Sequence, residues 1–384
     1  MTTPRRVVSL GATGSIGTQA ADVIVRNPER FDVVGLSATG RKLPELIAQV
    51  RDLTPQVVGV ADDQAAQELR SEFPRLEVID GASAATEVAA LECDVVLNGI
   101  SGAAGLEPTL AALDSGSKLA LANKESLIIG GPVVTRRAKP DQIIPVDSEH
   151  SALAQALRAG KRDEVDRLIL TASGGPFRGW DESRLRGISP EQALSHPTWD
   201  MGPLVTINSA TLVNKGLELI EAHLLFDMPL DGIEVVVHPQ SIVHSMVQFY
   251  DGSTLAQASP PDMRLPIGLG LAWPDRVADV APACDWSRPT EWTFEPVDHQ
   301  TFPAIGLATE VARAGGVLPA IFNGADEVAV AAFLDNRIPF TGIVKTVSNV
   351  VDLYDNTSAR NELEVADVLA ADRWARSAAQ DLIT

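Results

Sequence analysis

Two acidic residues follow a strand-like stretch near the middle of the chain, and their types and spacing suit a divalent metal ion. Asp147 and Glu149 come after the apolar run 143–146 and stand two residues apart. The period of two in a strand places both carboxylates on one face. Two carboxylates so close repel each other unless a cation or a shared proton lies between them. Oxygen ligands suit Mg²⁺ or Mn²⁺, although acids at a strand end are often simply solvated.

A later acidic segment offers a third ligand. Apolar residues recur there at helical spacing, and Ser209 is a candidate N-cap for the predicted helix. Asn214 and Glu218 stand four residues apart and Lys215 and Glu218 three apart, so each pair shares a helix face. Spacing alone does not choose between Glu218 and Glu221 as the ligand. An ordinary solvated helix face is the alternative.

Two segments rich in serine and glycine have the hydroxyl and backbone N–H groups that bind a phosphate. They are 171–176, which contains Ser173, and the pair 208–209. Lys215 would supply the positive charge that a phosphate needs. The segment 196–202 combines a histidine, a tryptophan and helix-breaking residues. This composition is typical of a loop that closes over a substrate, or of a plain ordered loop.

A glycine-rich turn near the start of the chain is typical of a dinucleotide site. Gly11, Gly14 and Gly17 lie between a predicted strand and a predicted helix. Glycines let the backbone approach a pyrophosphate at the helix N-terminus, although many strand–helix turns use glycine for geometry alone. The second strand ends without the acid that NAD sites use to bind the ribose. Arg41 and Lys42 stand there instead, which favours NADP(H) unless both are ordinary solvated residues.

The elements that would position these groups follow from the alternation of apolar runs. Up to residue 149, short apolar strands alternate with amphipathic stretches, which predicts an N-terminal Rossmann-like parallel sheet covered by helices. The predicted strands are 7–10, 33–37, 57–60, 94–99, 119–123 and 143–147, with helices at 18–26, 43–52 and 64–72. Ligands bind beyond the carboxyl ends of such strands, so the polar or glycine-rich clusters there should share one crevice.

Beyond residue 149 the pattern changes. Strands predicted at 167–172, 232–237 and 242–249 are longer and partly alternating, as in an antiparallel or mixed sheet. Helices are predicted at 304–314, 320–334 and 343–353. The predicted fold is therefore α/β, with an NADPH-binding domain at 1–146, an α+β catalytic domain at 147–285, a linker at 286–303 and a C-terminal helical domain at 304–384.

Composition restricts the function classes. The 384 residues carry a net charge of −20, which disfavours nucleic acid as a partner and requires a local cationic pocket for any phosphorylated substrate. No apolar stretch approaches the roughly 20 residues needed to span a membrane, and no signal peptide is recognisable, so we expect a cytoplasmic protein. Cys93 and Cys284 are predicted to be reduced, buried thiols.

Taken together, the motifs resemble the 1-deoxy-D-xylulose 5-phosphate reductoisomerase family over nearly the whole chain. The resemblance is carried, in the family's order, by GATGSIG (11–17), ANKESL (122–127), PVDSEH (145–150), TASGGPF (171–177), SHPTWDMG (195–202), NSATLVNKGLE (208–218), HPQSIVHSMVQF (238–249), PPDMRLPI (260–267) and the C-terminal helical segment. It implies a homodimeric oxidoreductase and isomerase that converts this sugar phosphate into 2-C-methyl-D-erythritol 4-phosphate, for isoprenoid biosynthesis, by skeletal rearrangement and hydride transfer from NADPH. The alternatives are an NADP-dependent dehydrogenase of the semialdehyde or homoserine type and an NADP-sensing binding protein.

The resemblance also implies roles for single residues. It places NADPH at Thr13, Gly14, Ser15, Ile16, Gly40, Asn123, Glu125 and Gly202, to which the charge at the second strand adds Arg41. It places Mg²⁺ or Mn²⁺ on Asp147, Glu149 and Glu218. It implies substrate contacts at Lys124, Ser148, Glu149, Ser173, His196, Trp199, Ser209, Asn214, Lys215 and Glu218. Glu149, Lys124 and His196 are the expected catalytic residues, with Glu149 favoured over Lys124 for proton transfer.

Two positions depart from the family pattern. Ala12 stands where serine is common, which should matter little because the backbone binds the phosphate there. The run 323–327 reads Asn-Gly-Ala-Asp-Glu where Ala-Ala-Asn-Glu is expected. It lies in the predicted C-terminal domain, so only packing or dimer contacts are affected.

Overall fold

The computed structural model describes residues 3–199, 201–355 and 363–384. The chain forms two compact units, each of which is discontinuous in sequence. Unit 1 comprises Met1–Ser126, Val134–Ser151 and Asp262–Pro282, and unit 2 comprises Leu127–Val133, Ala152–Pro261 and Ala283–Thr384. The domain boundaries predicted from the pattern of strands and helices in the sequence stay a prediction.

A seven-stranded sheet forms the centre of unit 1, and all of its strands are parallel, as predicted. Its order is β4-β3-β2-β1-β5-β6-β7. The strands are β1 (Arg5–Leu10), β2 (Phe31–Ala38), β3 (Val57–Val60), β4 (Glu77–Asp80), β5 (Val95–Asn98), β6 (Lys118–Leu121) and β7 (Ile143–Pro145). The chain winds outward from β1 to β4 and then returns beside β1, so the strand order reverses between β1 and β5. Such a reversal opens the ligand crevice of doubly wound folds.

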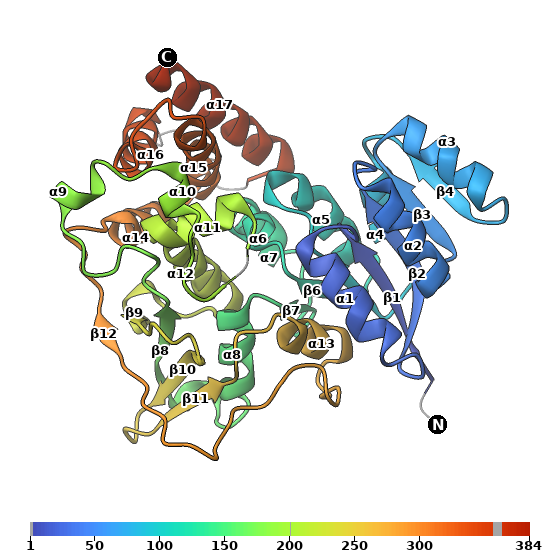
Figure 1. Cartoon of the computed structure of the whole chain (residues 1–384), viewed down its shortest axis with the longest axis horizontal. Coiled ribbons are helices and arrows are strands. Elements are labelled where there is room, and N and C mark those ends of the chain that lie inside the picture. Colours follow the sequence, from blue (N-terminus) through green and yellow to red (C-terminus); the bar gives the residue numbers. More distant parts are fainter. Residues whose placement is uncertain (1–2, 200, 356–362) are drawn as a thin grey trace. The chain divides into compact units, whose positions relative to one another are not determined.

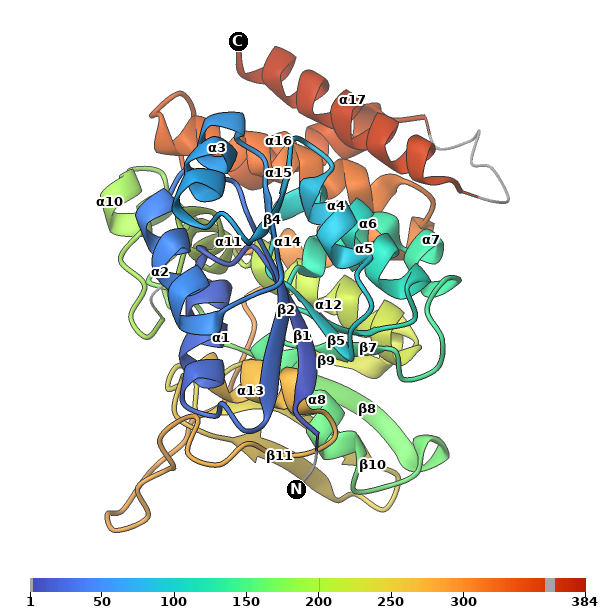
Figure 2. The ribbon, with the colours of Figure 1, turned by 90° about the vertical axis from the view of Figure 1, so that its right-hand side faces the viewer.

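Helices cover both faces of this sheet, which is why its central strands are apolar along their whole length. Figure 2 shows α1 (Ser15–Val25) and α2 (Leu43–Leu53) on one side, and α4 (Ala84–Ala89) and α5 (Leu106–Asp114) on the other. Unit 1 also contains α3 (Asp63–Glu72), η1 (Gly102–Gly105) and α13 (Arg264–Ala272). Although α13 is distant in sequence, it packs beside α1, where the Arg264 guanidinium donates to Asp22 at 2.7 Å (Figure 1).

Three helices lie where the chain passes between the units: α6 (Lys124–Gly130), α7 (Pro132–Thr135) and α8 (Ser148–Leu157). Unit 2 contains a mixed five-stranded sheet, in agreement with the prediction for this region. Its order is β11-β10-β8-β9-β12, and only β8 and β9 are parallel. The strands are β8 (Val165–Ala172), β9 (Ile233–Val237), β10 (Val243–Phe249), β11 (Thr254–Ala258) and β12 (Glu295–Pro296).

Unit 2 has its own set of helices, and Figure 1 shows two of the last ones, α16 and α17, beside α15 at the top of the view. The helices of this unit are α9 (Glu182–Leu185), α10 (Pro190–Ala193), α11 (Pro203–Thr211), α12 (Val213–Phe226), α14 (Ala304–Ala314), α15 (Leu318–Leu334), α16 (Gly342–Leu353) and α17 (Val365–Ile383), with the short turns η2 (Arg162–Glu164) and η3 (Leu230–Gly232). The unusual run 323–327 lies on α15. There the buried Asp326 accepts a hydrogen bond from Asn208 at 2.7 Å, so the substituted position ties α15 to α11.

Two local predictions are wrong. Ser209 is not an N-cap, because α11 begins six residues earlier at Pro203 and the chain breaks only at Leu212, whose φ is +61°. Cys93 and Cys284 are free thiols but half-buried rather than buried. Among the described helices, none is long and apolar enough to cross a membrane.

Candidate functional site

The turn between β1 and α1 has a backbone that only glycine can form. A Cβ on Gly11, whose φ is +74°, would lie 2.8 Å from the carbonyl oxygen of Gly99, and one on Gly17 would lie 2.3 Å from that of Ala12. Gly14 caps α1 without a side-chain hydrogen bond, and the first turn carries no acid. The first N–H groups of α1 therefore point to solvent or an anion, as a pyrophosphate site requires. Thr13 lies in this turn, and Ser15 and Ile16 are the first two residues of α1.

The end of β2 brings positive charge to the same turn. Gly40 has a φ of +94°, and Arg41 and Lys42 follow it with exposed side chains. The Lys42 ammonium donates to the carbonyl of Thr13 at 3.5 Å. A cation thus lies beside the glycine turn, where a 2′-phosphate would need it.

Buried asparagines hold the loops that follow β5 and β6. Asn98 donates to the carbonyl of Gly105 at 3.0 Å. Asn123 donates to Glu125 at 2.7 Å, and its Oδ1 accepts the Ser126 N–H at 3.0 Å, capping α6. The side chains of Asn123 and Glu125 therefore fix the loop whose backbone would face a cofactor. Asn98 is a positioning residue, which the sequence placed only within the predicted strand 94–99.

The acid pair beside β7 is close, but not for the reason its spacing suggested. β7 ends at Pro145, and Glu149 lies in the first turn of α8, so the argument from strand periodicity is wrong. Oxygen atoms of Asp147 and Glu149 nevertheless approach within 4.8 Å. Ser148 donates to the Glu149 carboxylate at 2.5 Å. The pair is a compact set of hard oxygen donors.

A lysine and a histidine determine the charge state of Asp147. Burial by itself would raise the pKa of this carboxyl, but the Lys124 ammonium at 2.5 Å and the neighbouring His150 hold its pKa well below the usual range. The Lys124 side chain is 9% exposed, and His150, 3.7 Å from Asp147, is fully buried. Asp147 is therefore ionised. His150 was missed by sequence reasoning, although its place three residues after Asp147 on a helix was the available signal.

In unit 2, His196 connects the loop 196–199 to the end of β8. Its Nδ1 accepts the N–H groups of Thr198 (3.1 Å) and Trp199 (2.9 Å), while its Nε2 lies 2.9 Å from Ser173 Oγ. Because Nδ1 accepts twice, the ring proton belongs on Nε2, which donates to Ser173. Burial lowers the pKa of His196, in agreement with a neutral ring.

The glycine loop after β8 lies against the end of α11. A Cβ on Gly175, whose φ is +64°, would lie 2.9 Å from the Cα of Ala210 and 3.0 Å from the carbonyl oxygen of Ser209. The loop that contains Ser173 and the end of α11 that contains Ser209 therefore lie side by side, and their role in binding a phosphate stays a prediction. Trp199 packs edge-on against the ring of His244, with the ring centroids 5.9 Å apart. Gly202 caps α11, and Asp200 lies outside the described residues.

Side chains on α12 form a polar group at the helix start. Asn214 and Lys215 both donate to the carboxylate of Glu218, as their spacing predicted. The side chains of Lys215 and Glu218 are only 4% and 1% exposed. An ammonium buried this deeply needs an anionic partner, and here that partner is Glu218. Glu221, the other candidate ligand, is fully buried on the same helix.

Three family models match the chain, and all describe one enzyme. The model for 1-deoxy-D-xylulose 5-phosphate reductoisomerase matches residues 7–131, that for its C-terminal domain matches 143–226, and that for the DXP reductoisomerase C-terminal domain matches 258–378. Curated relatives with the same name come from Rhodococcus jostii, 60% identical with 99% of this chain and 94% of the relative covered, and Streptomyces avermitilis, 57% identical with 97% of each covered.

Solved structures give the same result. A 1-deoxy-D-xylulose 5-phosphate reductoisomerase from Zymomonas mobilis in complex with NADPH is 42% identical, with a TM-score of 0.92 over 99% of both chains. A DOX-P reductoisomerase in complex with NADPH, fosmidomycin and magnesium is 35% identical, also with a TM-score of 0.92, over 99% of this chain and 98% of that one. The similarity extends through both units.

Proposed function

This chain belongs to the 1-deoxy-D-xylulose 5-phosphate reductoisomerase family, and we propose that the residues described above carry out the reaction for which the family is named. It is an NADPH- and divalent-metal-dependent enzyme that converts 1-deoxy-D-xylulose 5-phosphate into 2-C-methyl-D-erythritol 4-phosphate. The observation that carries this conclusion is 60% identity across 99% of the chain. The alternative of a semialdehyde or homoserine dehydrogenase is not favoured, because the family match continues through 143–226 and 258–378, beyond the cofactor-binding region.

The residues of this chain fit both NADPH and a divalent metal ion. Cβ atoms at Gly11 or Gly17 would collide with the protein's own backbone, so these glycines permit the tight turn that begins α1. The first turn of α1 carries no acid and no side-chain cap, which suits a pyrophosphate at this helix N-terminus. Asp147 and Glu149 supply hard, anionic oxygen donors, which suit Mg²⁺ or Mn²⁺. We assign the metal to these two and Glu218, and NADPH to Thr13–Ile16, Gly40, Arg41, Asn123, Glu125 and Gly202. When bound, NADPH supplies the hydride, and the metal polarises the substrate's carbonyl and hydroxyl oxygens.

The chain's own side chains then bind, orient and protonate the substrate. Ser173, Ser209, Asn214 and Lys215 bind the phosphate, with Lys215 providing its charge. His196, neutral and donating to Ser173, orients that hydroxyl. Trp199 covers the substrate from the loop 196–202, and the phosphate lies far enough from the reacting carbons that its binding energy can drive closure of this loop.

Proton transfer is assigned to the acidic side of the site. Ser148 donates to Glu149, so both are positioned together at the start of α8. Glu149 takes and returns the hydroxyl protons, and Lys124 stabilises the oxygen that develops negative charge. The ion pair of Lys124 with Asp147, at 2.5 Å, positions the Lys124 ammonium beside this acidic group.

A single assay tests the function. Purified enzyme is mixed with NADPH and 1-deoxy-D-xylulose 5-phosphate, and NADPH oxidation is followed by absorbance in EDTA and after addition of Mg²⁺ or Mn²⁺. We expect no turnover in EDTA and recovery with either metal. Undiminished turnover in EDTA would support a metal-independent dehydrogenase. If no turnover is found under any of these conditions, the assignment of 1-deoxy-D-xylulose 5-phosphate as the substrate is wrong.

Two further assignments are part of the proposal. We infer a homodimer, as the resemblance implies, and a cytoplasmic location, as expected from the sequence. Several large apolar side chains of unit 2 are exposed, and four of them support an interface between copies: Tyr250, Leu255, Trp286 and Phe294. Sedimentation equilibrium of the wild type and of Tyr250→Ser plus Leu255→Ser checks this, and a monomeric wild type would contradict it.

A further inference from the structure

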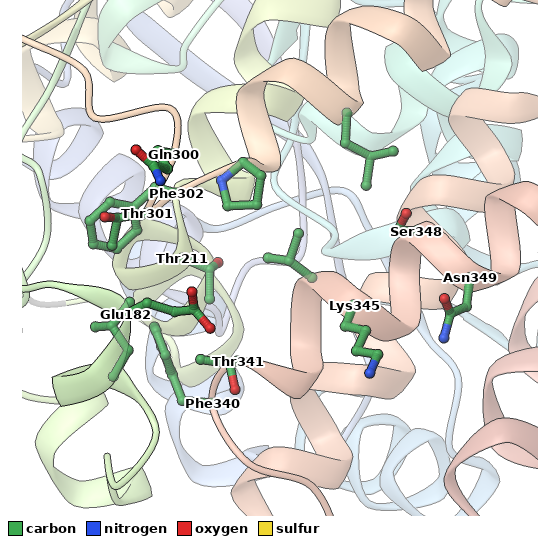
Figure 3. Close-up of a pocket in the computed structure, with 14 residues that line it drawn as sticks. Glu182, Thr211, Gln300, Thr301, Phe302, Phe340, Thr341, Lys345, Ser348 and Asn349 are labelled. Atoms are coloured by element: carbon green, nitrogen blue, oxygen red, sulfur yellow. The ribbon is translucent and has the colours of Figure 1, made fainter.

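Unit 2 contains a cavity of about 410 Å³ that involves none of the residues assigned above (Figure 3). Its walls come from α9, α14, α16, the segment 300–303 and the end of α11. Leu185, Thr211, Phe302 and Phe340, which line it, are buried, and Leu307 and Val344 add further apolar surface. A volume of this size with a mainly apolar lining is typical of small-molecule sites.

One edge of the cavity presents three polar side chains from a single helix. Lys345, Ser348 and Asn349 stand at positions i, i+3 and i+4 of α16, and Figure 3 shows them along the same wall. Within the described residues, none of the three makes a side-chain hydrogen bond or an ion pair. An ammonium, a hydroxyl and an amide on one face can together bind a carboxylate, sulfonate or phosphate.

The opposite end of the cavity carries a negative charge, that of Glu182. Figure 3 shows Glu182 across the cavity from Lys345, Ser348 and Asn349, with its side chain extending towards Thr211. Its carboxylate pairs with Arg186 at 3.3 Å, and both side chains are exposed. An anionic ligand therefore has one favourable orientation, with its charged group at α16 and its apolar body between Phe302 and Phe340.

We propose that this cavity binds a small amphipathic organic anion, a compact apolar body carrying one carboxylate, sulfonate or phosphate. The cavity also lies against the junction of α11 and α12. Thr211, the last residue of α11, donates to the carbonyl of Ile207 at 3.0 Å, and Leu212 makes the left-handed break that follows. Because α11 and α12 carry Ser209, Asn214 and Lys215, an occupant of the cavity alters substrate affinity through this junction.

Binding is measured by titration calorimetry and saturation-transfer NMR on the full chain, with naphthalene-1-sulfonate as the probe and neutral 1-naphthol as its matched analogue. We expect saturable sulfonate binding that 1-deoxy-D-xylulose 5-phosphate does not displace, and clearly weaker binding of the naphthol. Displacement by the substrate, or equal affinity for the two probes, would overturn the proposal.

Variants locate the site. Val344→Trp fills the cavity and should abolish binding. Lys345→Gln should weaken binding by about two- to five-fold, the range for an exposed charge pair, and should remove its dependence on salt. Glu182→Gln should leave binding unchanged or tighten it, and the exposed Lys161→Gln, outside the cavity, is the control. Wild-type affinity in Lys345→Gln would refute the proposal even if Val344→Trp fails to fold.

The link to the substrate has its own measurement. The KM for 1-deoxy-D-xylulose 5-phosphate should change when the probe is added to the wild type. In Val344→Trp the probe should leave this KM unchanged, and in Lys345→Gln the same probe concentration should change it less than in the wild type. If a saturating concentration of the probe leaves the KM of the wild-type enzyme unchanged, the coupling through Thr211 is wrong. Because binding is read without turnover, failure of this site and failure of the proposed function are distinguishable.

Discussion

Different substitutions of His196 test separately the hydrogen bonds that hold the loop 196–199. The ring accepts two backbone N–H groups through Nδ1 and donates to Ser173 through Nε2. Asparagine has an acceptor near the position of Nδ1, and glutamine has a donor near that of Nε2. His196→Asn therefore keeps the two hydrogen bonds to the loop and removes the one to Ser173, whereas His196→Gln does the reverse. His196→Ala removes all three.

The expected magnitudes follow from how many of these hydrogen bonds each variant removes. A neutral hydrogen bond in a half-buried position contributes about 1 kcal/mol. Without these bonds the loop is less ordered in the free enzyme, and substrate binding must order it. The KM for the sugar phosphate should rise about five-fold in His196→Asn, about 30-fold in His196→Gln and about 150-fold in His196→Ala.

Initial rates of NADPH oxidation, at saturating NADPH and metal, give the KM values. His299→Asn, at an exposed histidine outside the site, is the matched control and should leave KM unchanged. The order of the three variants matters more than any single value. If His196→Gln binds substrate better than His196→Asn, the tautomer derived from the geometry is wrong.

Three other perturbations test the assigned roles. Asp147→Asn and Glu218→Gln should each lower turnover by more than about 100-fold while NADPH affinity, measured by its fluorescence, is unchanged; wild-type turnover would remove that residue from the metal site. Arg41→Ala with Lys42→Ala should narrow the preference for NADPH over NADH by about ten-fold, and an unchanged ratio would place the 2′-phosphate elsewhere. Burial lowers the pKa of His196 below the usual 6.5, so its hydrogen bonds to the loop are complete above pH 6.5 and disappear as the pH falls through the lowered value. The KM ratio of His196→Asn to wild type should therefore change on acidification, and a ratio independent of pH would contradict this.

The parallel sheet of unit 1 was predictable because a strand covered on both faces is apolar throughout. β4 was missed for the same reason: Glu77 and Asp80 are exposed at the edge of the sheet, so its four residues lack an apolar run. The break at Leu212 was also beyond prediction. A leucine with a positive φ is unfavourable locally, and it is stabilised here by tertiary burial, with the side chain 4% exposed.

Residue types and spacing predicted the chemistry of the site better than its geometry. The pairs of Glu218 with Asn214 and Lys215 lie within one helical turn, so the helix period was sufficient to find them. The contacts of Lys124 with Asp147 and of Ser173 with His196 span 23 residues each, and only the folded chain brings their partners together. Long-range contacts of this kind require a topology, which periodicity does not supply.

Two buried lysines, Lys124 and Lys215, can supply the local positive charge that a strongly acidic chain needs in order to bind a phosphorylated substrate. Lys124 and Lys215 are both buried, and each is paired with a carboxylate assigned to the metal, Asp147 in unit 1 and Glu218 in unit 2. A buried ammonium is stabilised by a neighbouring anion, and these carboxylates supply part of that charge. If the carboxylates bind a divalent ion, they balance the lysine charges less, and both lysines attract the substrate's oxygens more strongly. Substrate affinity should therefore rise with Mg²⁺ by about ten-fold or more, and calorimetry that finds equal affinity with and without Mg²⁺ would contradict this coupling.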